Sequence, residues 1–192
     1  MTLAALAALA MPAAMPLAAH AATPAAAPAH DPAKVAVAKQ ILANFGIVDS
    51  LTLGGKSGLG QDDTIKALPK PDQDMVMSLF SDEMMKRKAT IIDAVAPDNV
   101  DRFTLDQLNA ILNLSKIKYV HDLVLSGADP SLPEPDPTTM TQAEAATFKA
   151  ADSQPFVSDF MRNMDVNASV PFVHDAAENA MKRFKAAKTP AQ

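Results

Sequence analysis

The stretch TLDQLNAILNLSKIKYVHDLVLS, residues 104–126, decides the fold class of this chain. It lies within the longest part of the sequence that has neither proline nor glycine. Its apolar side chains recur at helical spacing along one broad face: Leu105, Leu108, Ile111, Leu112, Leu114, Ile117, Tyr119 and Leu123. A stripe this broad is typical of a helix that packs on more than one side. The sequence therefore predicts one central helix, with Thr104 as its N-cap and Gly127 as a left-handed C-terminal cap.

Other helical segments are expected on both sides of the central one. Asp31 and Pro32 predict the start of the first helix, and Gly46 predicts its end. Residues 47–53 suit a short helix or a strand, and the helix is favoured because no partner strand is evident. The expected segments are 32–45, 47–53, 72–96 (one bent helix or two short ones), 104–126, 141–152, 155–164 and 172–188. The predicted fold class is all-α, a single irregular helical bundle of five to seven helices over residues 32–188.

The composition permits a sizeable core and excludes several kinds of site. The chain has 192 residues, of which 48% are hydrophobic and only 5% aromatic, so one domain with an aliphatic, Met and Phe core is expected. A net charge of −5 argues against a nucleic-acid-binding surface, which needs clustered Lys and Arg. The absence of cysteine excludes disulfides, thiol nucleophiles and Cys-ligated metal centres.

The first 21 residues predict a cleaved secretory signal peptide. They are apolar and uncharged, and they end in the small-x-small pattern Ala19-His20-Ala21. Their length and prolines make them too weak for a membrane-spanning helix. We expect cleavage after Ala21, a Pro/Ala linker over 22–31, a tail over 189–192, and a periplasmic or secreted mature protein without a transmembrane segment. The start lacks the usual Lys or Arg, and the alternative is a disordered tail on a cytosolic protein.

Two further segments are expected to be irregular. Residues 54–60, GGKSGLG, contain the Gly-Lys-Ser tail of a phosphate-binding loop, but Ser50 stands where that loop needs a glycine. Leu59 breaks the nucleophile-elbow pattern around Ser57, so the segment is predicted to be a mobile loop without a nucleotide or a nucleophile. Residues 128–138 contain four prolines and several acidic side chains, and they predict an extended, partly polyproline-II hinge.

A weak internal repeat relates residues 104–124 to residues 141–161. Without gaps, the alignment places Thr104 on Thr141, Ile111 on Phe148, Tyr119 on Phe156, Val120 on Val157, Asp122 on Asp159 and Leu123 on Phe160. Few residues are identical, so chance is the alternative to a true repeat. If the repeat is real, two capped amphipathic segments could pack as a pseudo-symmetric pair.

The repeat also resembles an uncharacterised bacterial family of secreted helical domains. The hallmark of that family is Phe-Thr-x-x-Glu-Leu followed by an aromatic residue and a Ser-Pro-x-Gly segment. The matching residues are Phe103, Thr104 and Leu108 in the first copy, and Thr141, Glu144, Phe148, Ser153 and Phe156 in the second. Gln107 replaces the Glu, and no Ser-Pro-x-Gly follows the first copy. The resemblance covers roughly residues 72–164; it implies an all-α periplasmic or secreted domain and supplies no catalytic residue.

Few residues are candidates for chemistry. His121 and His174 could hold a metal only if the fold brought them together, because adjacent helical residues point in different directions. A cluster of thioethers is a candidate Cu(I) site, although methionine is also a common filler of helical cores: Met75, Met77, Met84 and Met85. The basic run over 86–88 and the basic end of the last helix are expected to be solvated faces.

The sequence therefore favours a non-catalytic binding or envelope-maintenance module, without a cofactor or resident metal. Its partner is unknown and could be a protein helix that docks between helices after the acidic proline hinge closes. The alternatives from other classes are a periplasmic hydrolase that uses His121 with scattered Asp and Glu, Met-based Cu(I) binding, and membrane-surface association through the last helix. Neither the partner nor the oligomeric state follows from the sequence.

Overall fold

Residues 30–189 are described by a computed structural model of the chain, and within them the regular structure consists of helices without a β-strand. The α-helices are α1 (Pro32–Asn44), α2 (Ile47–Gln61), α3 (Asp63–Lys66), α4 (Lys70–Lys86), α5 (Lys88–Val95), α6 (Leu105–Ser115), α7 (Lys118–Ala128), α8 (Gln142–Asp152), α9 (Pro155–Arg162) and α10 (Val170–Lys188). Three 3₁₀ turns join them: η1 (Pro97–Asn99), η2 (Pro137–Thr139) and η3 (Asn167–Ser169). The predicted all-α class is confirmed. The expected signal peptide and most of the linker lie outside the described residues.

Local chemistry sets the start of α1 and the turn that separates α1 from α2. The Asp31 carboxylate accepts a hydrogen bond from the Ala33 amide, and Pro32 occupies the first turn of α1. Gly46 then adopts φ 65°, a left-handed conformation that glycine tolerates best. A Cβ atom at Gly46 would lie 2.6 Å from His121 Nε2, so this turn has no room for a side chain. The predicted end of the first helix is confirmed.

The prediction of a mobile loop over 54–60 is wrong, because these residues belong to α2. Helix α2 crosses α4 closely: a Cβ atom at Gly55 would lie 2.5 Å from Cζ of the fully buried Phe80 ring. A Cβ atom at Gly54 or Gly58 would instead point into open space, with no packing neighbour within 4 Å. Glycine weakens a helix on its own, but the packing of α2 against α4 outweighs that cost.

The prediction of one helix over 104–126 is also wrong, because the chain breaks between α6 and α7. Ile117 takes an extended conformation (φ −80°, ψ 120°) and is buried. Just before it, the Ser115 hydroxyl donates to the Leu112 carbonyl and accepts from the Asn44 amide group. Gly127 lies inside α7 and provides no left-handed cap. The N-terminal prediction is confirmed, since Thr104 and Gln107 form a reciprocal capping box.

The 72–96 segment resolves into two helices, α4 and α5, that meet at Arg87. Helix α4 begins earlier than expected, after Pro69. Together with the extra break at residues 116–117 and the short α3, this division produces more and shorter helices than the five to seven expected. The single helical bundle remains the architecture.

The internal repeat corresponds to a repeated pair of helices. Helix α8 begins and ends 37 residues after α6, and α9 begins 37 residues after α7. Both first helices carry a capping box, on Thr104 and Thr141. The linking residues agree as well: Ile117 and Gln154 take φ/ψ of −80°/120° and −94°/122°. The two copies therefore share their local backbone course.

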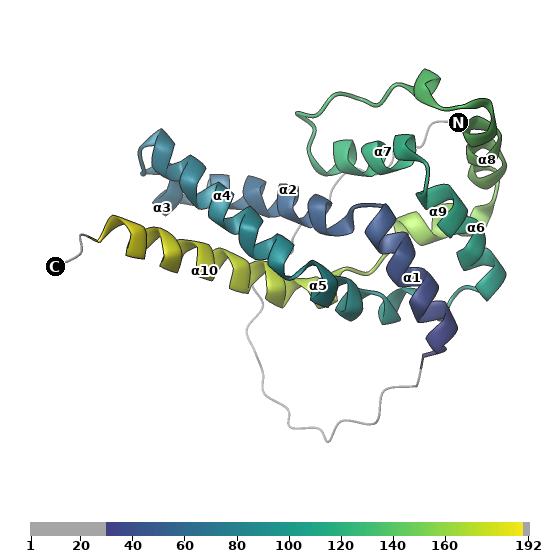
Figure 1. Ribbon diagram of the computed structural model, residues 1–192, viewed down its shortest axis with the longest axis horizontal. Helices are drawn as coiled ribbons and strands as arrows, with labels where there is room; N and C mark the ends of the chain where they lie inside the picture. Colours follow the sequence, from purple (N-terminus) through teal and green to yellow (C-terminus); the bar gives the residue numbers. More distant parts are fainter. Residues whose placement is uncertain (1–29, 190–192) are drawn as a thin grey trace.

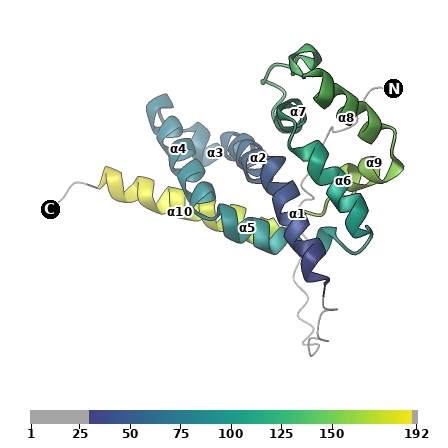
Figure 2. The same cartoon turned by 45° about the vertical axis from the view of Figure 1, so that its right-hand side comes forward.

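Figure 1 shows two parts of the molecule that join along α1. The arm, made of α2, α3, α4 and α10, extends to one side, with α4 and α10 packed lengthwise. The repeat lobe, residues 104–169, holds α6 to α9 on the other side, and Figure 2 shows the same separation. The main core runs through the junction between the arm and the repeat lobe. There the centroid of the Phe160 ring lies 6.3 Å from that of Phe45 and 5.4 Å from that of Phe103. A second, small core of Ile65, Val76 and Phe184 lies in the arm.

Candidate functional site

The connection from α7 to α8 is the most exposed ordered stretch of the described chain. The acidic proline loop, residues 129–139, leaves every residue from Pro130 to Thr139 exposed except Pro135, which is half-buried. Helix α8 follows without a single buried residue. Its Phe148 ring packs edge-on against Tyr119, with the ring centroids 5.4 Å apart. This surface arches over the outside of the repeat lobe in Figure 1.

Local hydrogen bonds hold this exposed stretch in a defined conformation. Asp129 Oδ1 accepts from the Ser131 amide at 2.9 Å, and Asp136 Oδ1 accepts from the Thr138 amide at 2.8 Å and its hydroxyl at 2.7 Å. These hydrogen bonds, from Ser131 and Thr138 respectively, lower the pKa of both carboxyl groups, so both stay ionised at neutral pH. Glu144 closes the capping box of α8, and hydrogen bonds from Thr141 lower its pKa too.

The repeat lobe carries the negative charge of the protein. Between residues 104 and 169 the sequence has nine Asp and Glu against four Lys and Arg, which is a net charge of −5, equal to that of the whole chain. No Lys or Arg stands between Lys118 and Lys149. The acidic proline loop therefore lies in a negative local field, which favours a positively charged partner surface.

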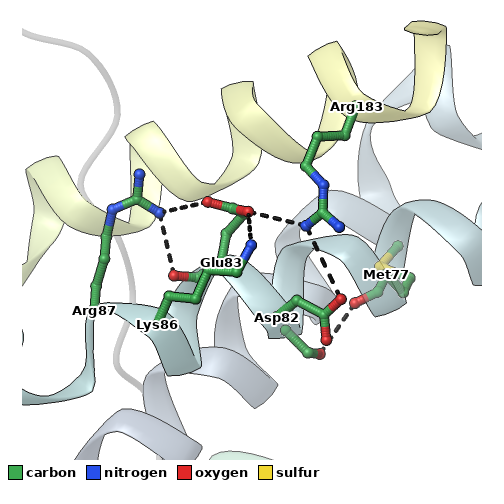
Figure 3. A network of polar contacts seen from close by, with 7 residues as sticks. Met77, Asp82, Glu83, Lys86, Arg87 and Arg183 are labelled. Carbon is green, nitrogen blue, oxygen red and sulfur yellow. Dashed lines mark hydrogen bonds and ion pairs between the residues drawn. The ribbon is translucent and has the colours of Figure 1, made fainter. Parts of the chain in front are cut away.

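A second polar cluster centres on Glu83 and ties the arm together. Its side chain is only 10% exposed, and it accepts hydrogen bonds from Lys86 (2.8 Å), Arg87 (3.0 Å) and Arg183 (2.9 Å), as Figure 3 shows. Hydrogen bonds from Lys86 first, then from Arg87 and Arg183, lower the pKa of Glu83, while burial opposes the shift. Arg183 comes from α10 and the others from α4 and its end, so this cluster fastens α10 to α4. All three basic residues of the run over 86–88 therefore form ion pairs: Lys86 and Arg87 pair with Glu83, and Lys88 Nζ lies 3.3 Å from Asp49 Oδ2.

His121 lies where α7 meets the turn between α1 and α2. Its Nδ1 is 3.3 Å from Asp122 Oδ1, and its Nε2 faces Gly46. A hydrogen bond from Lys118 first, and then from His121, lowers the pKa of Asp122. This histidine does lie beside a carboxylate, as the hydrolase alternative expects. Both of its ring nitrogens have close protein neighbours, however, and the catalytic role of His121 stays a prediction.

The remaining metal candidates are spread over the molecule. His174, on α10, pairs with Glu178 at 3.1 Å, and His121 pairs on α7. Met84 is fully buried, and Met77 packs in the small core of the arm. Met75 and Met85 are exposed and ten residues apart on α4, which separates them by about 15 Å along the helix axis. Within residues 30–189, no three His, Cys, Asp or Glu side chains are grouped so that they could hold a metal ion.

The glycine segment is placed unlike a phosphate-binding loop. Lys56 and Ser57 lie inside α2, so their amides belong to the helix and are not presented at a helix start.

Three basic side chains in the second half of α10 are paired: Lys182 pairs with Glu178, Arg183 with Glu83, and Lys188 with Asp72. Among the helices of the described part of the chain, none has the length and apolar character needed to cross a bilayer.

Sequence reasoning missed one residue that organises the junction. Asn99 is buried, and its amide group makes a two-point contact with the backbone of Asp165: Nδ2 donates to the carbonyl at 2.8 Å and Oδ1 accepts from the amide at 2.8 Å. Nδ2 also donates to the Val95 carbonyl at 2.9 Å. The only available signal was a polar residue in the turn after Pro97, which does not reveal a partner 66 residues away.

No family model, curated protein or solved structure matches this chain. The resemblance to secreted helical domains through residues 103–108 and 141–156 therefore stays a prediction.

Proposed function

We propose that this protein is a secreted or periplasmic helical binding module, non-catalytic, which engages a protein partner through residues 129–152. The proposal rests on one observation: the acidic proline loop and α8 are ordered by their own caps and turns, yet they contribute no fully buried side chain. A stretch that stabilises the core this little, and is nevertheless held in one conformation, is suited to contact with another molecule. Preorganisation lowers the conformational entropy lost on binding.

The charge distribution supports a partner with a basic surface. In the arm, Lys182, Arg183 and Lys188 near the end of α10 form ion pairs with carboxylates of the arm itself. The repeat lobe instead has more carboxylates than basic side chains. Complementary charge steers encounter and selects partners more than it adds affinity. Membrane-surface association through α10 has less support, because Phe184 is buried and Met181 packs beside it in the small core.

The experiment is an affinity pull-down from envelope extract with the chain from Ala22 onward as bait. Ala146→Arg adds a bulky cation to the exposed face of α8, and Ala186→Arg makes the same change on the exposed side of α10. We expect the wild type and Ala186→Arg to recover the same partner and Ala146→Arg to lose it. Recovery of no specific protein, or equal recovery by both variants, would contradict the proposal.

A further inference from the structure

We infer that the loop over residues 132–137, LPEPDP, is a peptide-like ligand whose extended stretch, residues 133–136, docks into an aromatic-lined groove of the partner, and that Lys or Arg side chains rim this groove. This inference rests on the proposed function and specifies the chemistry of the partner.

The backbone of this segment is set by its sequence. Three successive pairs place a residue before a proline: Leu132-Pro133, Glu134-Pro135 and Asp136-Pro137. Proline fixes its own φ near −65°, and it drives the preceding residue towards extended or polyproline-II conformations. Asp136 is extended, with φ −81° and ψ 114°, and residues 133–135 belong to no helix or turn. The Asp136 carbonyl then accepts from the Thr139 amide, which opens the 3₁₀ turn η2 at Pro137. Residues 133–136 are therefore held in an extended course, as their prolines favour, and this course is close to the conformation that aromatic grooves recognise.

The surface that the segment presents fits such a groove. Leu132 leaves 38% of its surface exposed beside the exposed Pro133, which gives an apolar pair free to insert between aromatic rings. Turns at Asp129 and Asp136 fix both ends, and the half-buried Pro135 holds the middle against the protein.

The flanking charges specify the rim of the groove. Glu134 is exposed next to Pro133, and the Asp129 and Asp136 carboxyls stay ionised at neutral pH. Because no Lys or Arg lies in this loop, a groove with an acidic rim would be repelled. A basic rim would instead pair with these carboxylates and weaken in salt.

The test is site-specific photo-cross-linking in the full-length chain, expressed in its own cells. Leu132→p-benzoylphenylalanine reports on the loop. Leu105→p-benzoylphenylalanine is the matched control, since Leu105 is also 38% exposed but lies at the start of α6. The competing probe is the synthetic peptide of residues 129–139, and its control has alanine for all four prolines and the same charge.

We expect a discrete adduct from position 132 and none from position 105. The peptide should abolish that adduct, and the alanine analogue should compete about tenfold or more weakly, since it loses the extended backbone that the prolines favour. The cross-linked partner peptide should contain Trp, Tyr or Phe, and raised ionic strength should reduce the yield. Equal competition by both peptides, no adduct, or a shared adduct at both positions overturns the inference. If the pull-down retains its Ala146→Arg-sensitive partner in such a case, the proposed function stands and only this docking mode fails.

Discussion

At the residue scale, single glycines allow two segments of this fold to pack closely against a neighbouring side chain. Gly55 allows α2 to meet the Phe80 ring, and Gly46 allows the α1–α2 turn to meet His121. Gly54 and Gly58 occupy the same helix without such a contact. Identical residue types in one segment therefore have opposite effects on stability, depending only on what lies opposite.

Gly55→Ala should lower the free energy of unfolding by about 1–3 kcal/mol, because the fully buried Phe80 ring has little room to move away. Gly54→Ala and Gly58→Ala should instead raise it by about 0.5–1 kcal/mol each, through reduced entropy of the unfolded chain. Urea denaturation followed by circular dichroism measures all three. A stabilising Gly55→Ala would refute the close packing of α2 on α4.

Asn99→Ala should destabilise the protein by about 2–3 kcal/mol, because it leaves the Asp165 amide and carbonyl and the Val95 carbonyl without this partner. Asn99→Asp keeps an acceptor for the Asp165 amide but loses both donated bonds, so it should rescue little of the loss. Thermal unfolding compares the two variants with Asn163→Ala. Asn163 also donates to a carbonyl, but from an exposed position, and its loss should cost below about 0.5 kcal/mol.

At the element scale, the same capping box contributes differently to stability, depending on how deeply its helix is buried. Helices α6 and α8 carry matching capping boxes, but α6 buries Leu108, Ile111 and Leu114 whereas α8 buries nothing. Thr104→Ala should therefore lower global stability by about 1 kcal/mol. Thr141→Ala should leave global stability within about 0.3 kcal/mol and speed local opening of α8. Denaturant unfolding and amide hydrogen exchange together separate these outcomes, and equal global losses would contradict the assignment.

The attachment of α10 to α4 should weaken in acid through Glu83. Its folded-state pKa lies below the ordinary value of 4.5, so the unfolded chain binds the proton more readily. The stabilisation is fully present above about pH 4.5 and is lost as the pH falls through the lowered folded pKa. Glu83→Gln should cost about 1–2 kcal/mol at neutral pH and give a flatter stability profile below pH 4.5.

Asp74→Asn is the matched control for Glu83→Gln, because its pair with Lys70 on the same helix is solvent-exposed. Its cost should stay below about 0.5 kcal/mol. Parallel pH profiles for the wild type and Glu83→Gln would show that this carboxylate does not fasten the two helices.

At the scale of the whole molecule, the two copies of the repeat are used asymmetrically. Helix α6 packs against α1, where its Ser115 hydroxyl accepts a hydrogen bond from the Asn44 side chain, and its Leu108 lies in the main core. Their equivalents in α8 are the exposed Ala145 and Asp152. In the following helices one pair of equivalent positions differs the other way: Phe160 is buried in the junction, and its equivalent Leu123 is only half-buried. At the Leu108 and Phe160 positions the larger apolar side chain stands in the copy that is buried there.

Phe160→Ala should therefore cost about 3–5 kcal/mol, because it empties the contact between the Phe45 and Phe103 rings. Leu123→Ala, the same truncation at the equivalent position, should cost about 1 kcal/mol, since part of that side chain already faces water. Guanidinium denaturation followed by circular dichroism provides the comparison. Similar losses for both variants would contradict the asymmetric use of the copies.

The sequence by itself determined the helical class, the caps at Asp31, Thr104 and Thr141, and the register of the repeat. Those features depend on periodicity and on hydrogen bonds that span three or four residues, so they are visible locally. Only the tertiary structure decided that residues 54–60 are helical, that the central segment breaks at Ile117, and that Asn99 holds the Asp165 backbone. Each of these depends on a partner far away in the chain, whose packing energy outweighs the local preference and whose identity no local pattern encodes. The acidic proline loop depends on both levels. Its extended backbone follows from its prolines, which the sequence shows. Its exposure to solvent follows from the positions of α7 and α8, which only the tertiary structure shows.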